Sequence, residues 1–268
     1  MDARRTDGEL LEACRTGDDA ALATLLERHA PAVLRFGTRM CKDPEDARDV
    51  MQETLIAAAR GLRDFRGDSA LTTWLYSVAR SFCIKKRRSS KFAPKTIDSL
   101  DDDDARVIAD EAPDPEAAAG SHELGAALEA AIRALEPAYR EVLVLRDVEG
   151  LSAPEVAEVL GIGVDAVKSR LHRARGAVRD RVAPLVDASP ETTECPDVLA
   201  AFSRHLEGDM APADCARMEQ HVASCKRCSA ACDSLKRTLV LCRSETGDVP
   251  AEVQQKVRAA VREAISRL

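Results

Sequence analysis

Apolar residues recur at helical spacing in four consecutive stretches that together cover most of the chain before residue 92. The pattern predicts a helical bundle that closes with the segment 74–84, and a run of basic residues follows directly at 85–88. The positions that carry it are Leu10, Leu11, Cys14, Leu22, Leu25, Leu26, Val33, Leu34, Phe36, Gly37, Val50, Leu55, Ile56 and Leu62.

The helical periodicity stops after residue 92, where Pro94, Pro113, Pro115 and the aspartate run 101–104 appear. We therefore predict a first unit over 1–92 and a flexible acidic linker over 93–121. A second compact helical unit follows over 122–184, and a cysteine-rich third unit over 190–268. The third unit ends in a predicted amphipathic helix that docks on a neighbour, with one apolar stripe of Val253, Val257, Val261, Ile265 and Leu268.

Composition supports an all-α fold, because aromatic residues make up only 3% of the chain and the apolar positions are mostly Ala, Val and Leu. The net charge of −7 is concentrated in residues 93–125, which carry 2 basic and 10 acidic side chains. Residues 168–181 carry six basic side chains against one aspartate, so a local basic face remains available to a nucleic-acid partner.

The chain shows no secretory leader and no apolar stretch approaching 18 residues, which favours a cytoplasmic protein that does not enter a membrane. Nine cysteines in a reducing compartment are more plausibly thiols or metal ligands than disulfides. Six of them follow residue 194, whereas Cys14, Cys41 and Cys83 lie on apolar stripes and are expected to be small core residues.

A helix-turn-helix is predicted near residues 151–178. Ser152 and Glu155 have capping-box spacing, Gly161 suits a left-handed helix end, and Asp165 can cap the next helix. A core stripe in that second helix leaves a polar and basic outer face suited to base edges and phosphates. An ordinary solvated helix pair would show charged outer faces too. The candidate DNA-binding residues on this helix are Lys168, Ser169, Arg170, His172, Arg173 and Arg175.

The segments 135–152 and 167–175 resemble region 4 of extracytoplasmic-function (ECF) sigma factors, which binds the minus-thirty-five promoter element. The segment 43–54 resembles region 2.2 of the same family, whose acidic and amide face binds the β′ subunit of core RNA polymerase; the resemblance implies contacts to the β and β′ subunits. Asp49, Gln52 and Glu53 can share one helix face and are the candidate polymerase-binding residues. The helix macrodipole alone would explain Glu45 and Asp46 equally well, but not Gln52 and Glu53.

The segment 65–80 resembles regions 2.3 and 2.4, which melt and read the minus-ten element. Opening a duplex requires a site for an unstacked base and cations for the backbone. Ser81 and Lys85 depart from the Asn and Asp common in the family, and a lone Trp in a bundle is more often a core residue than a stacking platform. The resemblance implies DNA contacts by Trp74, Arg80, Lys85, Lys86, Arg87 and Arg88.

The third unit carries Cys195 and the spaced set His221, Cys225 and Cys228, which is the number and type of ligands that a tetrahedral Zn²⁺ site uses. We expect His221, Cys225 and Cys228 to converge from one helix. His205 is expected to be a surface or packing residue. Three further thiols exceed the needs of one Zn²⁺ and suit copper, cadmium or a second metal; these candidate additional ligands are Cys215, Cys232 and Cys242.

This pattern resembles the zinc-binding fold of anti-sigma domains and the CorE-like group of sigma factors, whose cysteine-rich C-terminal domain responds to metals. The leading hypothesis is a metal-responsive sigma factor that binds core polymerase and promoter DNA. Two alternatives are a redox-regulated sigma factor with a fused anti-sigma domain, and a helix-turn-helix regulator independent of polymerase. An enzyme is not expected, because no nucleophile and base pairing is recognisable.

Overall fold

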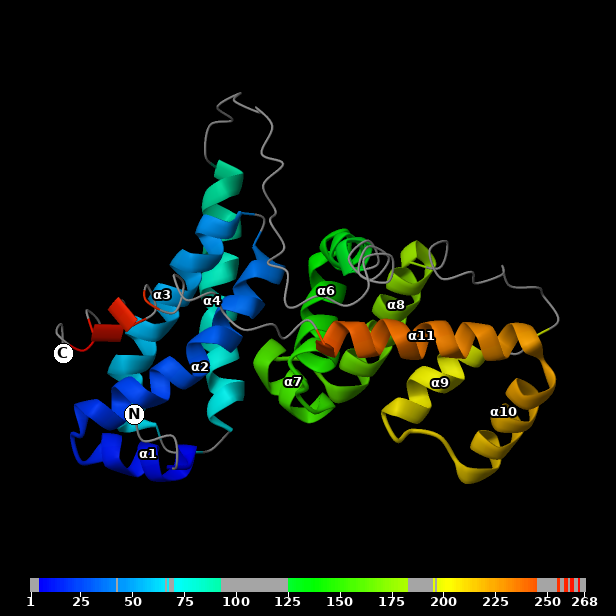
Figure 1. Cartoon of the computed structure of the whole chain (residues 1–268), viewed down its shortest axis with the longest axis horizontal. Coiled ribbons are helices and arrows are strands. Elements are labelled where there is room, and N and C mark those ends of the chain that lie inside the picture. The colour runs from blue at the N-terminus through cyan, green and yellow to red at the C-terminus, as the bar shows by residue number, and fades with distance from the viewer. Residues whose placement is uncertain are drawn as a thin grey trace, which may run out of the picture.

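The computed structural model describes residues 5–41, 43–65, 67, 70–92, 125–182, 195, 197–244 and single positions between 255 and 265. All regular secondary structure within these residues is helical, which confirms the all-α prediction. The predicted acidic linker over 93–121 lies outside the described residues. Figure 1 shows the helices gathered in two bodies, with the first helices in one and the later helices in the other.

The N-terminal bundle consists of α1 (Asp7–Arg15), α2 (Asp19–Met40), α3 (Pro44–Gly61), the short 3₁₀ helix η1 (Leu62–Asp64) and α4 (Leu71–Phe92). The hydroxyl of Thr6 and the carboxylates of Asp18 and Asp43 cap the first three helices by accepting backbone N–H groups. The predicted apolar stripes meet inside, where Leu10, Leu22, Leu25, Leu26, Phe36 and Leu55 are almost completely buried.

The second unit contains a helix over residues 125–133, α6 (Pro137–Leu143), the π-helical turn η2 (Val144–Val148), α7 (Ala153–Leu160) and α8 (Val164–Val182). Helices α7 and α8 form the predicted helix-turn-helix, with Val167, Leu171, Ala174 and Val178 of α8 buried. The expected cap at Asp165 is wrong: α8 begins at Val164, so Asp165 lies in its first turn and favours the helix through its charge.

The third unit contains α9 (Val198–Leu206), α10 (Pro212–Ser224) and α11 (Lys226–Ser244). It has a small core of its own, in which Val198, Leu199 and Phe202 of α9 contact Cys228, Cys232 and Leu235 of α11. Helices α9 and α11 also pack against α8, and Figure 1 shows α11 lying across the second unit. We call α9–α11 the cysteine-rich domain.

The N-terminal bundle and the second unit share one continuous core, with α4 packed against α7. Polar contacts surround this core: Arg35 and Tyr76 both donate to Glu149, at 3.2 and 2.7 Å. Burial and the adjacent Glu149 carboxylate raise the pKa of Tyr76 far above its usual range, so this phenol remains a donor. The two units are therefore held together by both apolar and charge-assisted contacts.

The C-terminal segment returns to the N-terminal bundle (Figure 1). Val261 is fully buried and Ile265 packs against the shared core, while Arg258 lies 3.4 Å from Glu27 of α2. The described positions of the predicted amphipathic stripe therefore dock on a neighbour, as expected. The chain beyond α8 consequently contacts the second unit through the cysteine-rich domain and the N-terminal bundle through its end.

Candidate nucleic-acid interface and metal centre

The helix-turn-helix is built by the local signals read from the sequence. Ser152 and Glu155 cap each other: the Ser152 N–H donates to the Glu155 carboxylate at 2.7 Å, and the Glu155 N–H donates to the Ser152 hydroxyl at 3.4 Å. These bonds from the Ser152 side chain and backbone lower the pKa of Glu155. Gly161 ends α7 with φ 66°, a left-handed conformation that glycine adopts without strain. The capping box and helix stop are confirmed.

The outer face of α8 is partly covered. Ser169 and Arg173 are exposed, and Arg170 and His172 are half-buried. Arg173 donates to the Tyr139 hydroxyl at 3.3 Å. The remaining two candidates on this helix, Lys168 and Arg175, contact the cysteine-rich domain.

Arg175 differs most from expectation, since it is 3% exposed instead of lying open on the outer face. Its guanidinium binds Asp147 of η2 through two hydrogen bonds of 2.9 and 2.7 Å. It also donates to the Ser203 hydroxyl and the Glu207 carboxylate of the cysteine-rich domain, both at 2.9 Å. Burial alone lowers the pKa of Arg175, but the two carboxylates outweigh it and raise that pKa. The outer-face expectation is wrong because α9 covers this part of α8.

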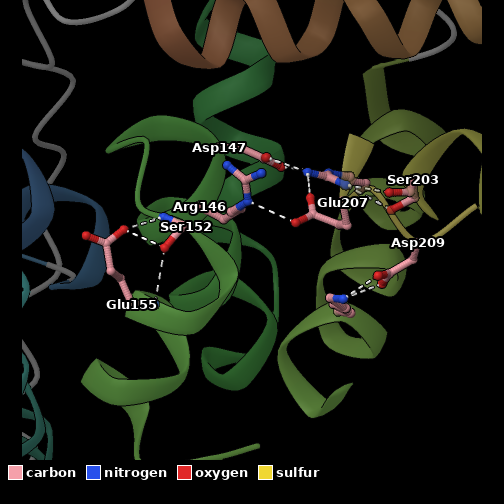
Figure 2. Close-up of polar contacts among 9 residues, drawn as sticks. Arg146, Asp147, Ser152, Glu155, Ser203, Glu207 and Asp209 are labelled. Atoms are coloured by element: carbon pink, nitrogen blue, oxygen red, sulfur yellow. Dashed lines mark hydrogen bonds and ion pairs between the residues drawn. The ribbon is translucent and has the colours of Figure 1, made fainter. Parts of the chain in front are cut away.

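The acidic end of α9 makes two further contacts with the second unit, as Figure 2 shows. Glu207 accepts a hydrogen bond from Arg146 at 3.0 Å, and its carboxylate is almost fully buried. Asp209 lies 2.5 Å from the Lys168 ammonium, at the N-terminal half of α8. Sequence reasoning missed Glu207 and Asp209, and the acidic stretch after Phe202 was the available signal.

The candidate DNA contacts of the N-terminal bundle are divided in the same way. Arg80 and Arg87 of α4 both bind the buried Glu141 carboxylate of α6, at 3.1 and 3.0 Å. Lys85 and Arg88 are exposed. Trp74 packs against Phe65 with ring centroids 5.5 Å apart, so this indole has a packing role in the bundle.

The candidate polymerase-binding face lies on α3. Asp49 and Glu53 are exposed and Gln52 is half-buried, one turn apart along the helix. Asp49 also pairs with Lys86 of α4 at 2.6 Å, which raises the pKa of that lysine. The face is thus accessible and fixed in position by the neighbouring helix.

The metal-ligand candidates meet at one point. The ligand atoms of Cys195, His221, Cys225 and Cys228 all lie within 4.8 Å of one another. The Cys195 and Cys225 sulfurs are 3.9 Å apart, close to the spacing of about 3.8 Å that two Zn–S bonds of about 2.3 Å impose at a tetrahedral centre. Burial and then the neighbouring thiols raise the pKa of Cys228 to about 12, so these thiols need a cation among them to become thiolates. The donor set fits zinc.

The expected convergence from a single helix is wrong. His221 is in the last turn of α10, Cys225 follows it in extended backbone, and Cys228 belongs to α11. The break at Cys225 reorients the chain so that ligands from two helices face Cys195, which precedes α9. A continuous helix would instead carry these side chains along its surface.

The other thiols have separate environments. Cys232 is buried in the small core of the cysteine-rich domain, and the Cys215 sulfur lies 3.4 Å from Nδ1 of the exposed His205. The side chain of Cys242 lies outside the described part of the chain. Cys14, Cys41 and Cys83 are buried in the bundle, as predicted, and the sulfurs of Cys41 and Cys83 are 3.8 Å apart.

Comparison with known families agrees with this division. Residues 25–92 match Sigma-70 region 2, residues 125–178 match Sigma-70 region 4, and residues 195–229 match a family described as "Putative zinc-finger". The RNA polymerase sigma-H factor of Pseudomonas aeruginosa is 32% identical over 190 residues, which cover 69% of this chain and 98% of that protein. The chain belongs to the ECF sigma factor family.

Other similar proteins include the ECF RNA polymerase sigma factor SigE of Mycolicibacterium smegmatis, 35% identical over 63% of this chain and 65% of that protein. A solved structure of CnrH in complex with the cytosolic domain of CnrY is 28% identical, covers 69% of this chain and 99% of that chain, and has a TM-score of 0.48. As a member of the family, the ECF sigma factor is a non-enzymatic initiation factor that binds core RNA polymerase and promoter DNA. None of the helices described here has the length and hydropathy needed to cross a bilayer.

Proposed function

We propose that this ECF sigma factor directs promoter-specific initiation in the cytoplasm and that metal binding at Cys195, His221, Cys225 and Cys228 controls its activity. The carrying observation is that the domain holding this four-ligand cluster packs directly on α8. Any metal-dependent change in the packing of α9–α11 therefore acts at the helix that reads DNA.

We assign the three parts as follows. Residues 1–92 bind core polymerase through Asp49, Gln52 and Glu53 and open the minus-ten element. Residues 122–184 read the minus-thirty-five element through the outer face of α8, and residues 190–268 sense metal. The exposed Ser169 and Arg173 support the assignment of α8, because small polar and arginine side chains suit base edges and phosphates.

Zinc is the first candidate cofactor, because one imidazole and three thiolates at these distances are a common structural zinc set. Such a site would join α10, α11 and the residue before α9. Copper and cadmium are the alternatives, since the remaining thiols of the domain are soft ligands. Of these, Cys215 is accessible beside His205, whereas the burial of Cys232 supports a packing role.

The deciding experiment is in vitro transcription by core polymerase with the full chain, after metal removal and after loading with zinc, copper or cadmium. We expect output to depend on the metal, and Cys195→Ala to abolish that dependence. Cys14→Ala is the matched control, because it removes a buried thiol from the N-terminal bundle. Equal output with and without every metal would refute metal control.

A second candidate is oxidant control, favoured by the 3.9 Å separation of the Cys195 and Cys225 sulfurs. Peroxide would accept two electrons as these thiols form a disulfide, with release of two water molecules and loss of the metal-ligand set. Mass spectrometry of the full chain after peroxide treatment tests this. Thiols that persist while the metal is retained would exclude it.

A further inference from the structure

One face of α8 is occupied by the chain itself. Lys168, His172, Arg175 and Arg179 lie at positions i, i+4, i+7 and i+11, so they form one stripe along the helix. Next to His172, Arg175 and Arg179, the space left beneath Leu199 of α9 and Leu235 of α11 is only about 10 Å³. We call this stripe the basic face of α8; the cysteine-rich domain packs closely on it.

We propose that the acidic end of α9, Glu207 and Asp209, is an internal substitute for DNA phosphates on the basic face of α8. The proposal rests on the proposed function in one respect, that α8 is the helix that approaches DNA. It adds a specific occupant for this face, namely a segment of the same chain, which competes directly with the duplex.

The chemistry of the contacts supports the competition. Carboxylates and phosphates are recognised by the same lysine and arginine donors, in the same short charge-assisted hydrogen bonds. The Lys168 ammonium is 2.5 Å from Asp209, so this donor is already engaged. Arg175 is enclosed by Asp147, Ser203 and Glu207 and cannot reach a phosphate while α9 is in place.

The rest of the chain keeps the occupant close to its site. The cysteine-rich domain contacts α8 and η2 on one side, and the C-terminal segment docks on the N-terminal bundle through Val261 and Arg258. A segment tethered in this way acts at an effective concentration in the millimolar range. DNA must therefore displace a local competitor before it can use the basic face of α8.

The two contacts differ in strength in a useful way. The Lys168–Asp209 pair is partly exposed, with side chains 27% and 37% accessible, whereas Glu207 is almost fully enclosed. Asp209 can thus be altered with little risk to folding, and Glu207 can be altered conservatively. If the covered form outnumbers the open form by about ten to one, removing the cover should tighten DNA binding roughly tenfold.

The test uses the full chain with the double substitution Glu207→Gln and Asp209→Asn. The probe is a short labelled DNA duplex of random sequence at low salt, because phosphate contacts do not require a known promoter. The matched control is Asp214→Asn with Asp233→Asn, which removes two charges from pairs internal to α10 and α11. We expect roughly tenfold tighter binding for the first variant than for the control.

A second measurement does not depend on DNA. Acetylation of Lys168, followed by mass spectrometry, should be several-fold faster in Asp209→Asn alone than in Asp214→Asn. Circular dichroism and bound metal should be unchanged in both. Equal DNA affinity and equal Lys168 acetylation in the test and control variants would overturn the proposal.

Both protein sets are measured after zinc loading and after treatment with a chelator, so the two proposals can fail separately. Tighter binding by the double variant, together with a wild-type chain indifferent to metal, would support the internal occupant and refute metal control. Metal-dependent binding by the wild-type chain, with the double variant matching its control, would support metal control and refute the occupant.

Discussion

Replacing Arg175 by methionine should strongly destabilise the contact between α8 and the cysteine-rich domain. The substitution keeps a long apolar side chain but removes all the donors to Asp147, Ser203 and Glu207. Glu207 retains Arg146 at 3.0 Å, whereas the Asp147 carboxylate, 2% exposed, loses its cation. Removing one partner of a buried ion pair costs about 3–5 kcal/mol, and we expect a loss in that range.

Urea unfolding provides the assay, because two signals report different parts of the chain. Circular dichroism follows all helices, whereas fluorescence follows Trp74, the single tryptophan, in the N-terminal bundle. With a urea dependence of about 2 kcal/mol per molar, the loss corresponds to a shift of roughly 1.5–2.5 M in the circular-dichroism midpoint. The fluorescence midpoint should move much less.

A companion variant identifies the cause. Adding Asp147→Asn to Arg175→Met removes the isolated charge, so this double variant should recover a large part of the lost stability. A single substitution that costs less than about 1 kcal/mol, the range of exposed ion pairs, would refute the reasoning. So would a double variant less stable than Arg175→Met alone.

Three further perturbations test other contacts. Glu141→Gln should weaken the pairing of its two arginines across the bundle and second unit, and small-angle scattering should then show a larger radius of gyration. The lowered pKa of Glu155 gives stability that is present above its ordinary value of 4.5 and lost as the pH falls further, so Glu155→Gln should flatten the acid dependence of unfolding below pH 4.5. Gly61→Ala would place a methyl group 3.0 Å from the Trp74 ring; it should shift the fluorescence maximum and cost about 1 kcal/mol in a thermal unfolding scan.

Local signals in the sequence were sufficient for the elements. The capping pair Ser152 and Glu155, the stop at Gly161 and the apolar stripe of α8 each depend on residues within about one or two turns, where backbone chemistry decides the outcome. The same reasoning failed at Cys225. There, the need to bring His221 and Cys228 together with Cys195 accompanies a break between two helices.

The covering of α8 depends on residues far apart in the chain, and no local pattern reveals it. Arg175 has the spacing of an outer-face residue, yet its burial depends on Ser203 and Glu207, about 30 positions later. Likewise, Arg80 and Arg87 belong to a basic run whose partner, Glu141, lies beyond the linker. Charge patterns predicted the basic faces but not the acidic groups that neutralise them.

The position of Asp147 determines what happens to Arg175 when α9 moves away. Asp147 belongs to the π-helical turn η2 of the second unit, so it remains bound to Arg175 through two hydrogen bonds while Glu207 and Ser203 leave. No unpaired charge is then stranded inside the second unit, and the departing carboxylates are hydrated in water. Separation therefore requires no unfolding of α8, and we expect a single molecule to cycle repeatedly between silent and active forms without being degraded.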